Sequence, residues 1–185
     1  MLGALRIRAG LSAWSLTLLF LFTLRAPAYA QVASEYQVKA AFVYNFAKFV
    51  EWPAREFATP TAPIRICVWK DHSFEAELNH IANGKSIAGR PVGIIAVQDA
   101  DQGRNCHILF VNSSQEKQVH HIVEVLRDTS VLTVGETRDF VDEGGIIGFT
   151  MQDDRVQFQV NHRAANQAGL RISSRLLSLA KRVIE

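Results

Sequence analysis

The chain has 185 residues, of which 48% are hydrophobic and 21% charged, a composition typical of a folded globular protein. Its formal net charge is +2, from 20 basic and 18 acidic side chains, but three of the basic residues lie in the first 30, which contain no acid. The remainder therefore carries 17 basic and 18 acidic side chains, a net charge of −1, so we expect no nucleic-acid partner.

The first residues follow the pattern of a secretion signal. Arg6 and Arg8 precede an apolar run over residues 11–24, and the small-residue end Ala28-Tyr29-Ala30 follows. The apolar run has 14 residues, fewer than the ~20 that span a bilayer as a helix. We expect a cleavable signal peptide over residues 1–30 and a single exported domain over residues 31–185.

The first element expected in this domain is a helix. Ser34 is a suitable N-cap, and Pro53 is a suitable stop. Apolar residues recur at helical spacing, but the additional aromatic residues Phe42, Phe46 and Phe49 widen the apolar face beyond one stripe. The helix is therefore either buried on more than one side or part of a binding surface.

Strands and helices then alternate along the chain. Short runs rich in β-branched residues predict strands at 64–69, 92–97, 106–111 and 131–134. Helices are expected at 73–82 and from Ser113 or Ser114 to about Arg127. This alternation predicts an α/β fold, a single-domain sandwich with a largely parallel sheet and helices on both faces.

The pattern changes after Gly135. Residues 146–151 and 155–160 are extended apolar runs separated by a polar turn, so we expect a C-terminal β-hairpin. A final helix is expected to start near Asn161. Its apolar residues step by three and four as far as Val183, which predicts one face packed on the sheet.

The two cysteines, Cys67 and Cys106, both lie in the predicted exported domain. Cysteines of exported proteins usually pair in their oxidising compartment. We expect one disulfide, and the alternative is two free buried thiols.

No residue pattern points to catalysis. Gly84-Lys85-Ser86 resembles the end of a phosphate-binding loop, but Asn79 stands where that loop needs glycine. Glu116, His120 and Glu124 share a helix face, yet a polar solvated face explains them better than a metal site, which needs about four ligands. We expect no enzyme activity, no metal and no cofactor.

Two features offer binding surface. Aromatic residues concentrate early in the domain, and the predicted hairpin provides an apolar edge that a partner strand can approach. For the aromatic residues, packing in the core is a simpler interpretation than a binding surface. For the hairpin, core packing and a binding surface are equally good interpretations. The aromatic residues concerned are Phe42, Phe46, Phe49, Trp52 and Trp69.

Three segments resemble the YfiR family of periplasmic proteins. They are Lys39-Ala40-Ala41-Phe42-Val43-Tyr44-Asn45-Phe46-Ala47-Lys48-Phe49-Val50-Glu51-Trp52-Pro53, then Gly144-Gly145-Ile146-Ile147-Gly148-Phe149, and Asn161 with residues 164–180. The resemblance covers essentially the whole domain.

This resemblance implies a regulator that binds the periplasmic sensor domain of an inner-membrane diguanylate cyclase and holds the cyclase inactive. Repression of cyclic di-GMP synthesis then lowers biofilm formation. The family also implies relief of repression by an outer-membrane lipoprotein, a homodimer, and an α/β sandwich without a catalytic centre.

Carried onto this chain, the family's first disulfide falls on Cys67 and Cys106. A second family disulfide would fall near Val141 and Gly148, where this chain has no cysteine. The family's partner-binding residues fall on Ile147, Phe149, Gln159 and Ala165.

The alternative hypothesis is a periplasmic small-molecule-binding sensor module. Its basis is the aromatic cluster and the tendency of α/β sheets to bind ligands at the carboxyl ends of their strands.

Overall fold

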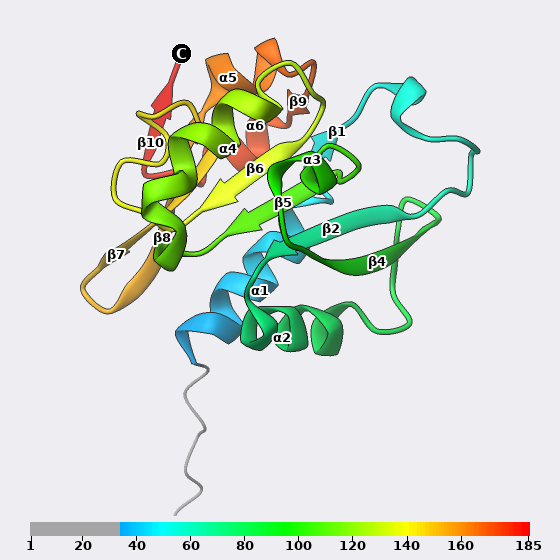
Figure 1. Cartoon of the computed structure of the whole chain (residues 1–185), viewed down its shortest axis with the longest axis horizontal. Coiled ribbons are helices and arrows are strands. Elements are labelled where there is room, and N and C mark those ends of the chain that lie inside the picture. Colours follow the sequence, from blue (N-terminus) through cyan, green and yellow to red (C-terminus); the bar gives the residue numbers. More distant parts are fainter. Residues whose placement is uncertain (1–33) are drawn as a thin grey trace, which may run out of the picture. The chain divides into compact units, whose positions relative to one another are not determined.

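A computed structural model describes residues 34–185 of the chain (Figure 1). The signal peptide predicted for residues 1–30 lies outside the described residues. The α-helices are α1 (Glu35–Phe46), α2 (His72–Ala82), α3 (Ala100–Gly103), α4 (Val119–Leu126), α5 (His162–Gln167) and α6 (Ser174–Leu177), and η1 (Ala54–Glu56) and η2 (Ser113–Gln118) are 3-10 helices. Within the described residues, none of the helices has the length and apolar character needed to cross a membrane.

The strands form one large sheet and one small one. The strands are β1 (Val50–Glu51), β2 (Ile64–Trp69), β3 (Ser86–Ile87), β4 (Arg90–Val97), β5 (Ile108–Val111), β6 (Leu132–Gly135), β7 (Ile147–Gln152), β8 (Arg155–Asn161), β9 (Arg171–Ile172) and β10 (Arg182–Ile184). The large sheet has the order β10-β8-β7-β6-β5-β2-β4-β3, with antiparallel pairing only at β3–β4 and β7–β8. The predicted α/β fold with a largely parallel sheet and a β-hairpin is confirmed.

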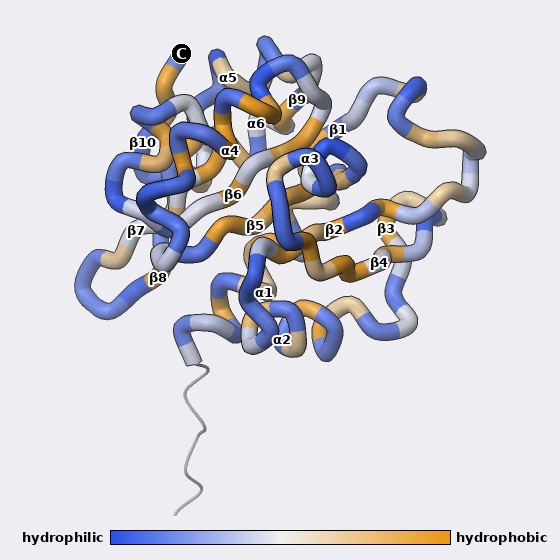
Figure 2. Tube along the Cα trace, in the orientation of Figure 1, coloured by the Kyte–Doolittle hydropathy of each residue, from blue (hydrophilic) through white to orange (hydrophobic). Residues whose placement is uncertain are grey.

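The central strands are buried on both faces because their side chains alternate between two apolar layers. Ile66 of β2 and Phe110 of β5 pack in the layer that holds α1 and α2. Trp69 of β2 and Leu109 of β5 pack in the opposite layer, with α3 and α4. Figure 2 shows the apolar residues gathered along these strands. The aromatic residues Phe46 and Trp69 are fully buried, which confirms the core interpretation for them.

Helix α1 begins as predicted but ends earlier. Ser34 accepts a hydrogen bond from the Gln37 backbone N–H, and the Gln37 side chain bonds back to Ser34, forming a capping box. The prediction that the helix continues to Pro53 is wrong, because the chain turns after Phe46 and β1 pairs with β9. This long-range strand pair overrides the helical spacing of the sequence.

The predicted continuous final helix is also wrong beyond Gln167. Gly169 has a φ of +71°, a left-handed conformation that suits glycine and ends a helix. After it come β9, the short helix α6 and β10, which pairs in parallel with β8. The apolar residues of this segment have helical spacing. Pairing of β9 with β1 and of β10 with β8 nevertheless divides it into short elements.

The predicted helix from Ser113 or Ser114 to Arg127 is present in two parts. Residues 113–118 form η2, and α4 begins at Val119. Asn112 precedes η2 without a side-chain cap, so the expected capping by Ser113 or Ser114 is not observed.

Cys67 and Cys106 form the predicted disulfide, with their Cα atoms 5.9 Å apart. The bond links β2 to the turn before β5 within the layer that holds α3 and α4. The two cysteines are 39 residues apart in the sequence. In the chain-entropy model, a disulfide that closes a loop of this length adds roughly 4 kcal/mol to the free energy of unfolding.

A buried histidine lies near the amino ends of β2 and β5. The His107 side chain is 1% exposed, and its ring stacks on Phe57 at a centroid distance of 4.6 Å. The backbone N–H of Arg65 donates to His107 Nδ1 over 3.0 Å, so a neutral ring carries its proton on Nε2. Burial, aided by the charge of Arg65, lowers the pKa of His107 to about 4.

This pKa makes the stability of the domain depend on pH. The unfolded chain binds a proton near pH 6.5 and the folded chain near pH 4, so the stabilisation is complete above pH 6.5 and is lost as the pH falls to 4. We expect about 3 kcal/mol of unfolding free energy to be lost in this window. Urea denaturation at a series of pH values measures the loss.

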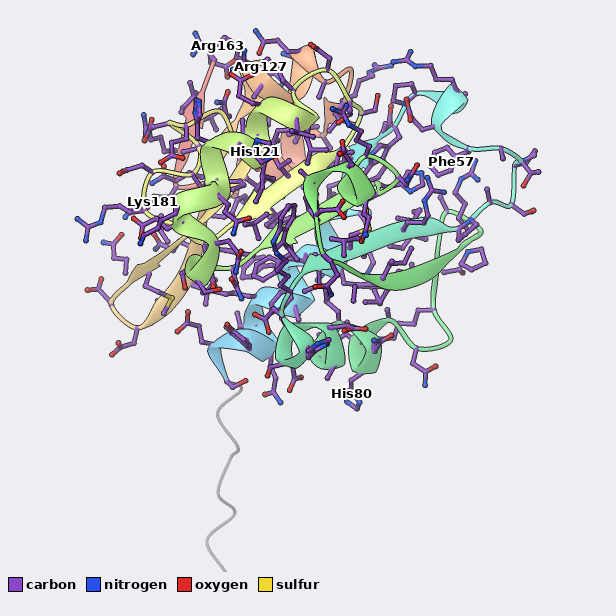
Figure 3. All side chains as sticks on the ribbon, in the orientation of Figure 1. Phe57, His80, His121, Arg127, Arg163 and Lys181 are labelled. Carbon is purple, nitrogen blue, oxygen red and sulfur yellow. A yellow bond between two sulfur atoms is a disulfide. The ribbon has the colours of Figure 1, made fainter. Side chains whose placement is uncertain are left out.

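His107→Asn removes the titrating ring and keeps an acceptor near Arg65, so its unfolding free energy should change less between pH 6.5 and 4. His80→Gln, at an exposed site on α2 (Figure 3), is the control and should behave as the wild type. Parallel pH profiles for wild type and His107→Asn would contradict the assignment.

Candidate functional site

The distal half of the β7–β8 hairpin extends past the strands on either side of it (Figure 1). β6 pairs with β7 only at Ile147 and Gly148, and β10 pairs with β8 only over residues 159–161. Residues 149–158 therefore have no strand partner outside the hairpin within the described chain. Met151, near the tip, is 47% exposed. An unpaired backbone edge and an exposed apolar side chain are features of a protein-binding surface.

Three of the predicted partner-binding residues lie on the hairpin, at or close to its base, and the fourth lies on α5. Ile147, Phe149 and Ala165 are buried, with exposed fractions of 0%, 3% and 0%. Gln159 is half-buried, and its Oε1 accepts a hydrogen bond of 3.4 Å from Arg182. In the described structure only Gln159 of the four reaches the surface, and the other three support it from the core.

Phenylalanine packing fixes the hairpin to α1. Phe46 of α1 lies 5.9 Å from Phe149 and 5.2 Å from Phe158, measured between ring centroids. Phe42 of the same helix lies 6.1 Å from Phe149 and 5.7 Å from Phe158. Aromatic pairs at such distances stabilise by about 0.5–1.5 kcal/mol each beyond area burial. Because these rings pack together, a movement of the hairpin also moves α1.

A buried ion-pair network lies beside the hairpin. The Lys39 side chain is 6% exposed, and its Nζ is 2.5 Å from a carboxylate oxygen of Glu136 and 2.5 Å from one of Glu35. The other Glu136 oxygen accepts a hydrogen bond from the Ser113 backbone N–H over 2.9 Å. Burial acts to lower the pKa of Lys39, but the hydrogen bonds to Glu136 and Glu35 outweigh it and raise the pKa. Lys39 is therefore a permanent cation.

A second carboxylate extends the network. One oxygen of Asp71 accepts hydrogen bonds from the Tyr36 hydroxyl over 3.2 Å and from the Asn112 amide over 2.8 Å. Burial, with the negative charges of Glu136 and Asp71, raises the pKa of Tyr36 to about 12. Tyr36 is therefore neutral, and the cluster of Lys39 with Glu35, Glu136 and Asp71 has a net charge of −2.

This cluster lies where the carboxyl ends of the parallel strands meet. Asp71 follows β2, Asn112 follows β5, and Glu136 follows β6. Ligands of open α/β sheets bind at such carboxyl ends, near the point where the strand order reverses. A small crevice of about 280 Å³ opens there, lined by Lys39, Phe149 and other residues of α1 and the hairpin.

Sequence reasoning did not select Lys39, Asp71, Asn112 or Glu136 as site residues. The sequence did offer one indication of the site. A polar residue (Asp71, Asn112 or Glu136) comes within two residues of the end of three of the predicted strands. What the sequence did not reveal was that Lys39 of the first helix meets Glu136, 97 residues later in the chain.

The arrangement suits the binding of a charged or polar group. Each carboxylate of the cluster already accepts hydrogen bonds from the chain, and the net negative charge favours a cationic group on whatever binds the crevice. Within residues 34–185, no group of three or more His, Cys, Asp or Glu side chains is placed to hold a metal ion.

A protein-family model described as YfiR/HmsC-like matches residues 36–181. Apart from Glu35, that range includes α1, the disulfide, the hairpin and the polar cluster. A comparison with curated proteins gives no significant match.

A solved structure shares the fold of this chain at low sequence identity. A crystal structure of a conserved domain protein from Vibrio cholerae O1 biovar El Tor has a TM-score of 0.59 and 10% identity, over 81% of this chain and 60% of the other. The ABC domain from Streptococcus pneumoniae in complex with L-Trp has a TM-score of 0.46 and 12% identity, over 65% and 55%. This chain thus spans about 60% and 55% of their lengths.

The buried ion pair gives a stability prediction. Lys39→Met leaves Glu136 as an uncompensated buried charge, so we expect a loss of about 3–5 kcal/mol of unfolding free energy by urea denaturation. Adding Glu136→Gln removes that charge and should recover part of the loss. Glu35→Gln, at a side chain 48% exposed, is the control and should cost less than about 1 kcal/mol. Equal losses for Lys39→Met and Glu35→Gln would contradict this account.

Proposed function

The chain belongs to the YfiR/HmsC-like family, and we propose from this membership that it is a periplasmic negative regulator of an inner-membrane diguanylate cyclase. By binding the sensor domain of the cyclase, it represses cyclic di-GMP synthesis and thereby biofilm formation. Removal of the regulator by an outer-membrane lipoprotein relieves the repression. In this role the protein is a binding protein and not an enzyme.

The observation that carries the proposal for this chain is the open distal half of the hairpin. Its residues 149–158 offer unpaired backbone to a partner, and Met151 offers exposed apolar surface. We propose that Gln159 contacts the cyclase directly. Ile147, Phe149 and Ala165 act indirectly, because their burial fixes the shape of the hairpin base.

Charge adds a requirement on the partner. The cluster with Glu35 and Glu136 beside the hairpin is net negative, so the facing surface of the sensor domain should present Lys or Arg. Repression follows if the regulator binds the inactive cyclase more tightly than the active one. A near-complete switch needs a difference of about 5.5 kcal/mol.

We further propose that the regulator is a homodimer joined at β4. Residues 93–97 pair with β2 on one side and have no strand on the other within the described chain. The stretch is uncharged, and its Ile95 is 40% exposed. Antiparallel pairing of β4 with its copy is self-complementary and covers an edge that natural proteins otherwise protect.

The function is tested by gene deletion combined with a hairpin variant. Deletion should raise cellular cyclic di-GMP, and Met151→Glu should raise it as well, with at least about tenfold weaker binding to the sensor domain because it places a charge in an apolar contact. Leu179→Glu, at another exposed apolar site, is the control and should bind as the wild type. Unchanged cyclic di-GMP after deletion would refute the proposed function.

The dimer is tested by placing a charge on the open edge. Ile95→Lys should convert the dimer to a monomer in sedimentation velocity, because paired copies would bring two lysines together in an apolar contact. Leu179→Lys is the control, since it lies between α6 and β10 at the other end of the strand order. A monomeric wild type, or a dimer that Ile95→Lys leaves intact, contradicts pairing at β4.

A further inference from the structure

A large cavity lies away from the hairpin crevice, near the starts of β6 and β7. Its volume is about 870 Å³, within the range of roughly 300–1,000 Å³ found for small-molecule sites. Helices α4 and α5, strand β10 and the segment between β6 and β7 surround it. The cavity is about three times as large as the crevice of 280 Å³.

The buried floor of the cavity is mostly apolar, with Thr133 and Asn161 as its polar residues. Its apolar side chains have exposed fractions of 2–7%, so they form a fixed surface against which an apolar group can pack. They are Val123, Leu126, Val131, Val141, Ile146 and Ala168.

The rim is net positive. Arg127, Arg163 and Arg182 line the cavity together with Asp128 and Asp142, which gives three positive charges against two negative. In Figure 3, Arg163 of α5 and Arg127, which directly follows α4, lie at the same edge of the molecule. A rim of this charge favours an anionic ligand over a cationic one and disfavours a purely apolar one.

The three guanidinium groups differ in what they already bind. Arg127 donates to Glu124 over 2.6 Å, and Arg182 donates to both oxygens of Asp142 over 2.9 and 3.1 Å. Arg163 has no ion pair and no side-chain hydrogen bond within residues 34–185. Its planar fork of donors matches a carboxylate or phosphate group.

We propose that this cavity binds a small amphipathic oxyanion, with its charged group at Arg163 and its apolar body on the buried floor. The size of the cavity fits an organic molecule and exceeds what an inorganic anion fills. Carboxylate and phosphate share the required chemistry, since both accept paired hydrogen bonds from arginine.

The same site connects to the proposed partner surface through Arg182. This guanidinium bonds Asp142 and also donates to Gln159 Oε1 over 3.4 Å. An oxyanion in the cavity competes with Asp142 for Arg182, and a shift of Arg182 removes its contact with Gln159. The ligand thereby alters cyclase binding, a step that rests on the proposed function.

Calorimetry on the purified protein tests the site without any partner. The probes are 4-phenylbutyrate, 2-phenylethyl phosphate and the neutral 4-phenylbutanol. We expect at least one anion to bind about tenfold or more tightly than the alcohol, because a charge-assisted hydrogen bond is worth that much. The better anion identifies the oxyanion class. Equal affinity for anions and alcohol, or no binding of any probe, overturns the proposal.

Two variants locate the binding. Arg163→Gln should weaken anion binding about tenfold or more and leave alcohol binding unchanged. Arg138→Gln, an exposed arginine outside the cavity, is the control and should bind the anion as the wild type. Unchanged anion affinity in Arg163→Gln overturns the assignment of the site.

The regulatory step is measured separately, by titrating the cyclase sensor domain with and without saturating anion. We expect the anion to change sensor-domain affinity in the wild type and not in Arg182→Gln. Anion binding with no effect on the sensor domain overturns the link through Arg182. A sensor domain that fails to bind even without anion contradicts the proposed function and leaves the calorimetric result standing.

Discussion

Burial of β2 and β5 on both faces is the constraint on which the rest of the domain depends. Each of these strands supplies alternate side chains to two apolar layers, so helices must cover both faces of the sheet. α1 and α2 cover one face, and α3 and α4 the other. The disulfide between Cys67 and Cys106 belongs to the second layer and links these two strands covalently through the turn before β5.

Because helices cover both faces of the sheet, its ends and edges are the parts of it that stay open. The carboxyl ends carry the acidic cluster around Lys39 and lie beside the open hairpin. Near the starts of β6 and β7 is the larger cavity with Arg163 on its rim. Arg182 joins the cavity to Gln159 at the hairpin base. The proposed ligand response requires two distinct sites and a physical connection between them.

The locations of the phenylalanines show how a residue proposed to influence partner binding can be buried. Phe149 packs on Phe42 and Phe46 of α1, so it holds the hairpin in place and does not face solvent. Substitution at such a residue changes the presentation of Gln159 and Met151 without removing a direct contact. Binding data from this region therefore need a folding control.

The sequence by itself determined the features that depend on neighbouring residues: the Ser34 cap, the four parallel strand runs, the hairpin, and the single possible cysteine pair. Only the tertiary structure decided what depends on distant partners. β1 and β9 replaced helical continuations because each pairs with the other across about 120 residues of sequence. Lys39 meets Glu136 only when α1 packs beneath the carboxyl ends of the strands. The burial of Ile147 and Ala165 likewise follows from layers assembled around them. Local spacing carries no information about such contacts, because the free energy that selects them comes from packing between segments far apart in the chain.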